Sequence, residues 1–308
     1  MSLPGLIKSK GPSGFGYTAT AKDVTEGLQL TGQTFLVTGC ATGLGLETAK
    51  ILSTRGAFII AANRSQSRCQ ETIDAIPGKG AIAICDLADI NSVSSCITTI
   101  KDMDVSLQGI VCNAGVMAYP KLTLIQNTEA QLYINHLSHF KLVNELLNNL
   151  TETARVVMVS SMAHKATVKR GIQFDNTDGS KGYEAWSFYG QSKLANLLFA
   201  RSLPQKLKPS QKAFAVHPGV IATQLTRYMN PLLAGAWSLA SPFFMKTIAQ
   251  GAATQVFAAT HPQLNSYNGE YLYDCNVKKS SHYGSDMALA EELWQWSNQK
   301  LAQLSGQQ

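Results

Sequence analysis

Short apolar runs alternate along this chain with longer segments whose apolar residues recur at helical spacing. The runs are expected to be strands, and they span residues 34–37, 58–61, 81–84, 109–112, 155–159, 213–216 and 270–273. Helical periodicity predicts helices over 46–55, 67–76, 93–100, 129–150, 189–203, 250–260 and 288–304. Near-continuous apolar strands joined by helices are typical of parallel strands buried on both faces. The pattern therefore predicts an α/β fold, a doubly wound parallel sheet of the Rossmann type with about seven strands and helices on both faces.

Domain organisation follows from the absence of internal repeats, low-complexity linkers and composition breaks in the 308 residues. One domain is expected over residues 32–308, preceded by an arm over residues 1–31. The arm has no apolar leader segment, and no apolar stretch reaches the ~20 residues that a membrane helix needs. The nearest candidate, residues 231–245, is short and interrupted by proline. A soluble protein is expected.

Composition narrows the classes of function. With 45% hydrophobic and 15% charged residues, the chain has the composition of a globular protein. Its net charge of +6 is modest and spread along the chain, whereas nucleic-acid binding requires a dense basic cluster. The six cysteines form no CxxC pair and no Cys/His metal spacing, so no metal site is expected. Free thiols are typical of a reducing compartment, and a cytoplasmic location is predicted.

A glycine-rich turn, Thr-Gly-Cys-Ala-Thr-Gly-Leu-Gly at residues 38–45, follows the first predicted strand and opens a helix. Gly39, Gly43 and Gly45 permit a tight turn and let backbone N–H groups approach a pyrophosphate at the helix N-terminus. A glycine cluster alone is often an ordinary loop. Its place between a strand and a helix favours a dinucleotide site.

The end of the second predicted strand indicates which dinucleotide binds. An acidic residue there typically holds the ribose 2′-hydroxyl of NAD, whereas a 2′-phosphate requires a cation. Residues 61–65 read Ala-Ala-Asn-Arg-Ser, with no acid and with Arg64, which can bind a phosphate through charge-assisted hydrogen bonds. NADP(H) is therefore predicted in preference to NAD(H). The alternative is that Arg64 is a solvent-facing loop residue.

Tyr189 and Lys193 lie four positions apart in a predicted helix and so share one of its faces. A nearby positive charge favours phenolate, so the pKa of Tyr189 is expected to fall toward neutral pH. Such a phenol suits a general acid/base for a carbonyl/alcohol couple. On their own, two residues at this spacing more often lie on a solvated surface.

Taken together, these motifs and Asn113-Ala114-Gly115 resemble those of the short-chain dehydrogenase/reductase family, from about residue 33 to 274. Further segments resemble its retinol-dehydrogenase-like branch, which includes the WW-domain-containing oxidoreductase and plant chloroplast-envelope short-chain dehydrogenases. These segments are residues 135–140 (Asn-His-Leu-Ser-His-Phe), 159–164 (Val-Ser-Ser-Met-Ala-His), 189–196 (Tyr-Gly-Gln-Ser-Lys-Leu-Ala-Asn) and 217–219 (His-Pro-Gly).

The resemblance implies catalytic roles for Tyr189 as proton donor and acceptor, Lys193 beside it, Ser161 on the substrate oxygen and Asn135 near a proton-relay water. Ser160 is the alternative to Ser161. Without the resemblance, Asn135 would be expected to be a helix-surface amide, and His136 and His139 are expected to be structural or surface residues. The implied cofactor-binding residues are Thr38, Gly39, Thr42, Gly43, Leu44, Gly45, Asn63, Arg64, Asp86, Leu87, Asn113, Ala114, Gly115, Tyr189, Lys193, Pro218, Gly219 and Thr223.

The function expected is an NADP(H)-dependent oxidoreductase that interconverts a carbonyl and an alcohol. The resemblance implies a lid over residues 226–246, whose apolar character favours a lipophilic substrate such as a retinoid, steroid or fatty aldehyde; a buried helix pair is the equal alternative. Two rivals remain: a nucleotide-sugar epimerase or dehydratase, which normally needs a larger C-terminal domain, and an NADP(H)-binding regulatory or scaffold protein with weak or vestigial activity. The family includes homo-oligomers as well as monomers.

Overall fold

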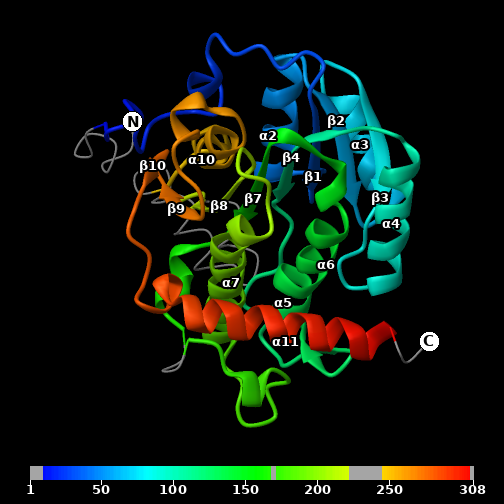
Figure 1. Cartoon of the computed structure of the whole chain (residues 1–308), viewed down its shortest axis with the longest axis vertical. Coiled ribbons are helices and arrows are strands. Elements are labelled where there is room, and N and C mark those ends of the chain that lie inside the picture. The colour runs from blue at the N-terminus through cyan, green and yellow to red at the C-terminus, as the bar shows by residue number, and fades with distance from the viewer. Residues whose placement is uncertain (1–9, 168–170, 222–244, 306–308) are drawn as a thin grey trace, which may run out of the picture.

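A single large sheet runs through the protein, with helices on both of its faces (Figure 1). The computed structural model describes residues 10–167, 171–221 and 245–305. The strands of this sheet are β1 (Thr34–Thr38), β2 (Phe58–Asn63), β3 (Gly80–Ile84), β4 (Leu107–Cys112), β7 (Leu150–Val159), β8 (Lys212–His217), β9 (Glu270–Tyr273) and β10 (Asn276–Val277). Their spatial order is β10-β9-β8-β7-β4-β1-β2-β3, and all neighbours are parallel except β9 and β10.

The sheet confirms the predicted α/β fold of the Rossmann type, and each of the seven predicted runs forms a strand. The eighth strand, β10, was missed because it is only two residues long, too short to show a hydrophobic pattern in the sequence. A separate hairpin, β5 (Leu124–Ile125) with β6 (Thr128–Glu129), was missed for the same reason.

The helices begin and end within a few residues of the predicted ranges, with one exception described below. The α-helices are α2 (Gly43–Thr54), α3 (Gln66–Ala75), α4 (Ile90–Asp102), α5 (Ala130–Leu132), α6 (Ser138–Glu145), α7 (Ala185–Ser202), α10 (Ile248–Thr260) and α11 (Met287–Ser305). Short 3₁₀ turns are η1 (Asp23–Thr25), η3 (Leu147–Asn149), η4 (Met162–Lys165), η5 (Phe174–Asn176), η6 (Leu203–Gln205), η8 (Pro262–Leu264) and η9 (Tyr283–Ser285). Capping fixes some of the starts: Thr247 and Gln250 form a capping box at α10, and the Glu184 carboxylate accepts from two N–H groups of α7.

Two cores lie on opposite faces of the sheet because successive residues of a strand point to opposite sides. In β1, Phe35 and Val37 belong to the core beneath α2 and α10, whereas Leu36 belongs to the core beneath α4, α6 and α7. The last helix, α11, packs on the outer side of α7 (Figure 1).

The predicted continuous helix over residues 129–150 is wrong in two ways. A π turn, η2 (Tyr133–Leu137), lies between α5 and α6, and α6 ends at Glu145. The chain is already in β7 from Leu150, five residues before the predicted start at Arg155. Single π turns inside helices occur often at functional sites, and this one carries Asn135.

The described part of the N-terminal arm packs against the rest of the chain. The Asn276 side chain of β10 accepts from Ser13 N–H and donates to the Phe15 carbonyl. Further along, Ala21 N–H donates to the carbonyl of Ala249 in α10. Backbone groups of the arm therefore obtain partners from the sheet edge and from α10.

A buried ion pair supports the loop that follows β8. Lys246 Nζ lies 2.6 Å from Asp274 Oδ1 and near the rings of Tyr17 and Tyr273, and the lysine side chain is fully buried. The stem of the lysine packs under Gly219, where an added Cβ would lie 2.6 Å from Lys246 Cδ. The pair therefore connects the β9–β10 turn to a loop that lines the cavity described below.

Asp274→Asn is expected to lower the free energy of unfolding by roughly 3–5 kcal/mol, because the buried ammonium of Lys246 loses its counter-charge. Asn tolerates the left-handed backbone of Asp274 (φ 52), so the turn itself is not strained by the change. Urea unfolding measures the loss. The double variant Lys246→Met/Asp274→Asn should lose less than the single one, and equal stability of wild type and Asp274→Asn would contradict the assignment.

Within the ranges that the structure describes, no helix is both long and apolar enough to cross a membrane. Residues 231–244 of the apolar candidate, nearly all of the predicted lid and Thr223 lie outside the described residues.

Candidate active site

A cavity of about 950 Å³ opens at the carboxyl ends of the parallel strands, lined by residues that follow β1, β2, β4, β7 and β8. The strand order reverses between β1 and β4, and ligands of doubly wound sheets bind at such a switch point. The fold therefore brings together side chains that lie as far apart in sequence as residues 38 and 248.

The glycine-rich turn forms one wall of this cavity and has no room for a side chain at Gly39 or Gly45. A Cβ at Gly39 would lie 2.8 Å from the Cα of Ala114, and a Cβ at Gly45 would overlap the Gly39 carbonyl. Asn113 Nδ2 donates to the carbonyls of Thr38 (3.0 Å) and Gly39 (3.1 Å), which fixes the turn against β4. The turn leads directly into the N-terminus of α2, so its geometry fits a dinucleotide pyrophosphate.

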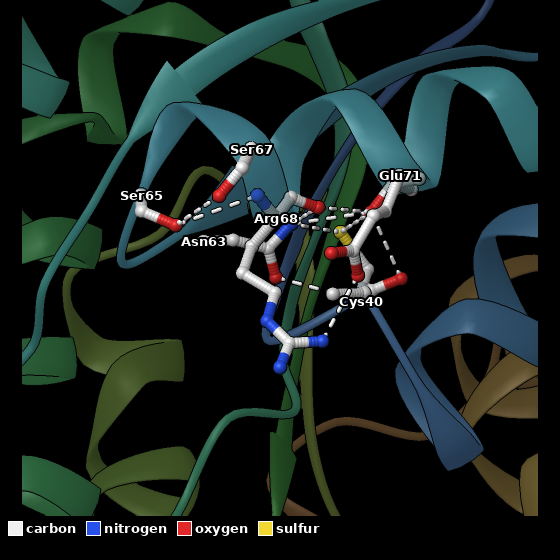
Figure 2. A network of polar contacts seen from close by, with 8 residues as sticks. Cys40, Asn63, Ser65, Ser67, Arg68 and Glu71 are labelled. Carbon is white, nitrogen blue, oxygen red and sulfur yellow. Dashed lines mark hydrogen bonds and ion pairs between the residues drawn. The ribbon is translucent and has the colours of Figure 1, made fainter.

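Asn63 lies in the polar network at the end of β2 that Figure 2 shows. Its Oδ1 accepts from Ala41 N–H, and its Nδ2 donates to the carbonyl of Arg68 and to Thr72 Oγ1. The amide is almost fully buried, so it holds the end of β2, the glycine-rich turn and α3 in one arrangement.

Two arginines border the cavity here, Arg64 and Arg68. Ser65 caps α3 by accepting from Arg68 N–H, and the Arg68 guanidinium pairs with exposed Glu71 at 2.9 Å (Figure 2). Sequence reasoning found Arg64 but missed Arg68. A basic residue in the first turn of the helix after Arg64 was the signal that could have found it.

At the other end of the cavity, Tyr189 and Lys193 lie one turn apart on α7 and are both buried. Lys193 Nζ is 5.8 Å from the centroid of the Tyr189 ring and donates to the Val159 carbonyl at 2.9 Å. The alternative of a solvated helix surface is therefore wrong.

The expected fall in the pKa of Tyr189 is not found. Burial raises the pKa of this phenol to about 12, although a hydrogen bond with the Ser161 side chain lowers it in part. Burial also lowers the pKa of Lys193 to about 8. Sequence spacing showed that the two groups are close but not how far both are removed from water, and desolvation disfavours each charged form.

The two serines after β7 have different partners. Ser161 is hydrogen-bonded to Tyr189 and caps η4 by accepting from Ala163 N–H. Ser160 is buried, and its hydroxyl donates to the Lys193 carbonyl at 2.7 Å. Ser160 thus ties β7 to α7, and the geometry favours Ser161 as the hydroxyl next to the phenol.

Asn135 is fully buried in the π turn, so the expectation of a helix-surface amide is wrong. Its Oδ1 accepts from Val116 N–H, and its Nδ2 donates to the Val116 carbonyl and to Ser192 Oγ. Gly115 lies between Asn135 and Lys193, because an added Cβ there would be 2.9 Å from Asn135 Oδ1 and 3.3 Å from Lys193 Nζ. Asn135 lies behind the cavity wall and does not line it.

All other predicted site residues line the cavity, apart from Thr223, which lies outside the described residues. Sequence reasoning missed the apolar end of the cavity near Tyr189, which is formed by Met117, Tyr119, Met162, Trp186 and Val220. These side chains come from loops, from η4 and from the start of α7, so no single stretch of sequence indicates them. In the described ranges, no three His, Cys, Asp or Glu side chains gather as metal ligands, and all six cysteines are free and buried.

A family model described as short chain dehydrogenase matches residues 33–232. Among curated relatives, the short-chain dehydrogenase TIC 32 A, chloroplastic, of Brassica napus is 37% identical, over 96% of this chain and 98% of that protein. Retinol dehydrogenase 11 of Mus musculus is 35% identical, over 88% of this chain and 86% of that protein.

Two solved structures of other proteins have the same fold as this chain. An uncharacterised protein from Mycobacterium paratuberculosis has a TM-score of 0.72 and 29% identity, over 90% of this chain and 96% of its own. A citronellol catabolism dehydrogenase of Pseudomonas aeruginosa, at a TM-score of 0.59 and 21% identity, covers 80% of this chain and shares the fold.

Proposed function

The chain belongs to the short-chain dehydrogenase family, oxidoreductases that act on CH–OH groups with a nicotinamide cofactor, and we propose that its cofactor is NADP(H) and its substrate lipophilic. The observation that carries this proposal is one cavity with two different ends. Arg64 and Arg68 border one end, and Tyr189 stands among apolar side chains at the other.

The bound nicotinamide supplies a hydride in carbonyl reduction and accepts one in alcohol oxidation. In reduction, the Tyr189 phenol donates its proton to the substrate oxygen, so that hydride and proton together complete the alcohol. The Ser161 hydroxyl supports the charge that develops on that oxygen. The Lys193 ammonium, held by the Val159 carbonyl, stabilises the resulting phenolate, and solvent returns the proton.

The arginines favour a 2′-phosphate because two guanidinium groups border the cavity where the adenosine ribose would lie. Asp86 is the single acidic side chain among the described lining residues, and it follows β3, whereas Arg64 follows β2 directly. A carboxylate at the position of Arg64 would repel the phosphate.

Arg64→Ala/Arg68→Ala is expected to raise KM for NADPH by roughly 10²- to 10⁴-fold, because each of the two lost charge-assisted hydrogen bonds contributes about 1.5–3 kcal/mol. KM for NADH should change little. Steady-state kinetics with both cofactors measures the shift.

Glu71→Gln is the matched control for the arginine variant. It removes the Arg68–Glu71 ion pair and leaves both guanidinium groups, so NADPH should bind as tightly as before or more tightly. Equal losses for NADPH and NADH in the double arginine variant would contradict the assignment of these residues to the 2′-phosphate.

A lipophilic substrate is proposed from the end of the cavity around Tyr189. Trp186 packs edge-on to the Tyr189 ring, with centroids 6.0 Å apart, and Met162 follows Ser161 directly. Met162, Trp186 and Val220 are about half exposed. Exposed apolar side chains that lie together are typical of a surface that binds an apolar ligand. Lys193 is the one charged side chain among the described lining residues at this end.

Turnover of a series of aldehydes of increasing chain length, with retinal included, tests the proposed function. With NADPH, kcat/KM should rise with apolar chain length, because each buried CH₂ contributes about 0.8 kcal/mol. Activity confined to short polar carbonyls would reject the lipophilic substrate. Tight NADPH binding without turnover of any carbonyl would instead favour a regulatory protein.

The cytoplasmic location and a homo-oligomer remain proposals. Six free, buried cysteines are compatible with a reducing compartment. The Brassica napus relative is named as chloroplastic, so fractionation of the source cells decides the location.

A further inference from the structure

Two fully buried histidines, His136 and His139, lie next to the catalytic groups and have no part in the proposed reaction. His139 lies in the first turn of α6 and connects two parts of the site. Its Nε2 is 2.9 Å from Thr38 Oγ1, in the glycine-rich turn, and its Nδ1 is 2.9 Å from the Asn135 carbonyl, in the π turn.

The partners of His139 determine where its proton lies. A carbonyl only accepts, so Nδ1 carries the hydrogen and donates it to Asn135. Burial lowers the pKa of His139 to about 4, so the ring is neutral and Nε2 accepts from the Thr38 hydroxyl. That hydroxyl oxygen in turn accepts from Ala114 N–H at 3.0 Å. Every donor and acceptor in this chain of hydrogen bonds is satisfied.

His139 contacts the π turn, the segment that carries Asn135. The Asn135 amide joins Val116, in the cavity wall, to Ser192, the neighbour of Lys193 on α7. Gly115 packs against both Asn135 Oδ1 and Lys193 Nζ, so a shift of the π turn would reach the lysine. A π turn departs from the regular helical ladder, and tertiary contacts are needed to keep it.

We propose that His139 is a positioning residue that locks the π turn against the glycine-rich turn and so keeps Asn135 between Val116 and Ser192. The proposal rests on the proposed function insofar as it concerns the rate of the reaction. The glycine-rich turn itself is held separately by the Asn113 side chain, so cofactor binding depends much less on His139 than the chemical step does.

His136 provides a matched control on the same turn. The hydroxyl of Ser297 donates to the Leu293 carbonyl, so its oxygen accepts from His136 Nε2–H, and the ring faces α11 and the rings of Phe140 and Phe199. His136→Phe and His139→Phe each remove one buried imidazole of the same segment. Only the second change breaks the connection between Thr38 and Asn135.

The experiment compares these two variants by amide hydrogen exchange of Val116 without cofactor and by steady-state kinetics. His139→Phe should accelerate exchange of Val116 N–H, which donates to Asn135 Oδ1, and lower kcat about tenfold, the effect of one lost hydrogen bond, with KM for NADPH nearly unchanged. His136→Phe should leave Val116 exchange and kcat at wild-type values. The proposal is overturned if His139→Phe matches His136→Phe in both readouts.

A measurement on the unaltered protein covers the case in which His139→Phe does not fold. Nitrogen-15 spectra of the imidazoles should show His139 neutral at pH 7 with its proton on Nδ1, and His136 with its proton on Nε2. A protonated His139, or one with its proton on Nε2, overturns the proposal. Neither the exchange experiment nor the spectra need turnover, so absence of activity on every carbonyl would count against the proposed function alone.

Discussion

Tyr189→Phe is expected to lower kcat by roughly 10²- to 10⁴-fold while the Kd for NADPH stays close to that of the wild type. In the proposed reaction the phenol is the acid that protonates the substrate oxygen, and phenylalanine fills the same buried volume on α7 without that proton. The ring would still pack against Trp186, so the cavity should keep its shape. Single-turnover oxidation of NADPH, followed together with cofactor binding by fluorescence, separates the two quantities.

Tyr271→Phe is the control for this variant. Tyr271 is also buried, lies in β9 and has no hydrogen-bond partner for its hydroxyl among the described residues, so the change should leave kcat at its wild-type value. If Tyr189→Phe retained kcat within about threefold of wild type, a general-acid contribution of the usual size would be excluded.

Lys193→Met is expected to lower kcat by roughly 10²- to 10³-fold, the range found when one electrostatic group of an active site is removed. Without the ammonium, only the Ser161 hydroxyl opposes the desolvation that already raises the pKa of Tyr189 to about 12, so phenolate becomes harder to form. The loss should be larger for alcohol oxidation, which begins from phenolate, than for carbonyl reduction, which begins from the phenol.

Stability measured against pH gives an independent test of Lys193. Burial lowers the pKa of Lys193 from 10.5 to about 8, so between these two values the unfolded state binds more protons than the folded state. Stability from this group therefore rises with pH through that window. Buried thiols such as Cys40, whose pKa is raised to about 11, make stability fall as the pH rises, and they do so equally in wild type and in Lys193→Met.

The difference in unfolding free energy between wild type and Lys193→Met isolates the lysine. The free energy of unfolding of the wild type should rise relative to that of the variant between pH 8 and about 10. A difference that stays constant with pH would show that the lysine is not desolvated. A kcat within about threefold of wild type would remove Lys193 from the mechanism.

The strands and the glycine-rich turn could be predicted because local sequence determines them. Parallel strands buried on both faces read as apolar runs, and glycines at positions such as Gly39 and Gly45 are needed where no Cβ fits. The π turn could not be predicted, because it is held by His139, Thr38 and Ala114, which lie on three separate elements.

The same limit applies to the site. Spacing along one helix placed Tyr189 beside Lys193, but the direction of the Tyr189 pKa depends on burial, which only the folded structure determines. The family resemblance supplied Asn135, and the structure showed that its amide clamps the cavity wall. Arg68 lies in the first turn of α3, where no motif singles it out. The apolar end of the cavity was missed because loops, η4 and α7 build it together.

Transfer of deuterium from NADPH labelled at the nicotinamide C4 position tests the central claim most directly. Incubated with a long-chain aldehyde or retinal, the wild type should give an alcohol with one deuterium on the carbinol carbon, and Tyr189→Phe should form it at least about 100-fold more slowly. Tight binding of labelled NADPH with no deuterium in any carbonyl product would contradict the account and identify the chain as a cofactor-binding protein without this chemistry.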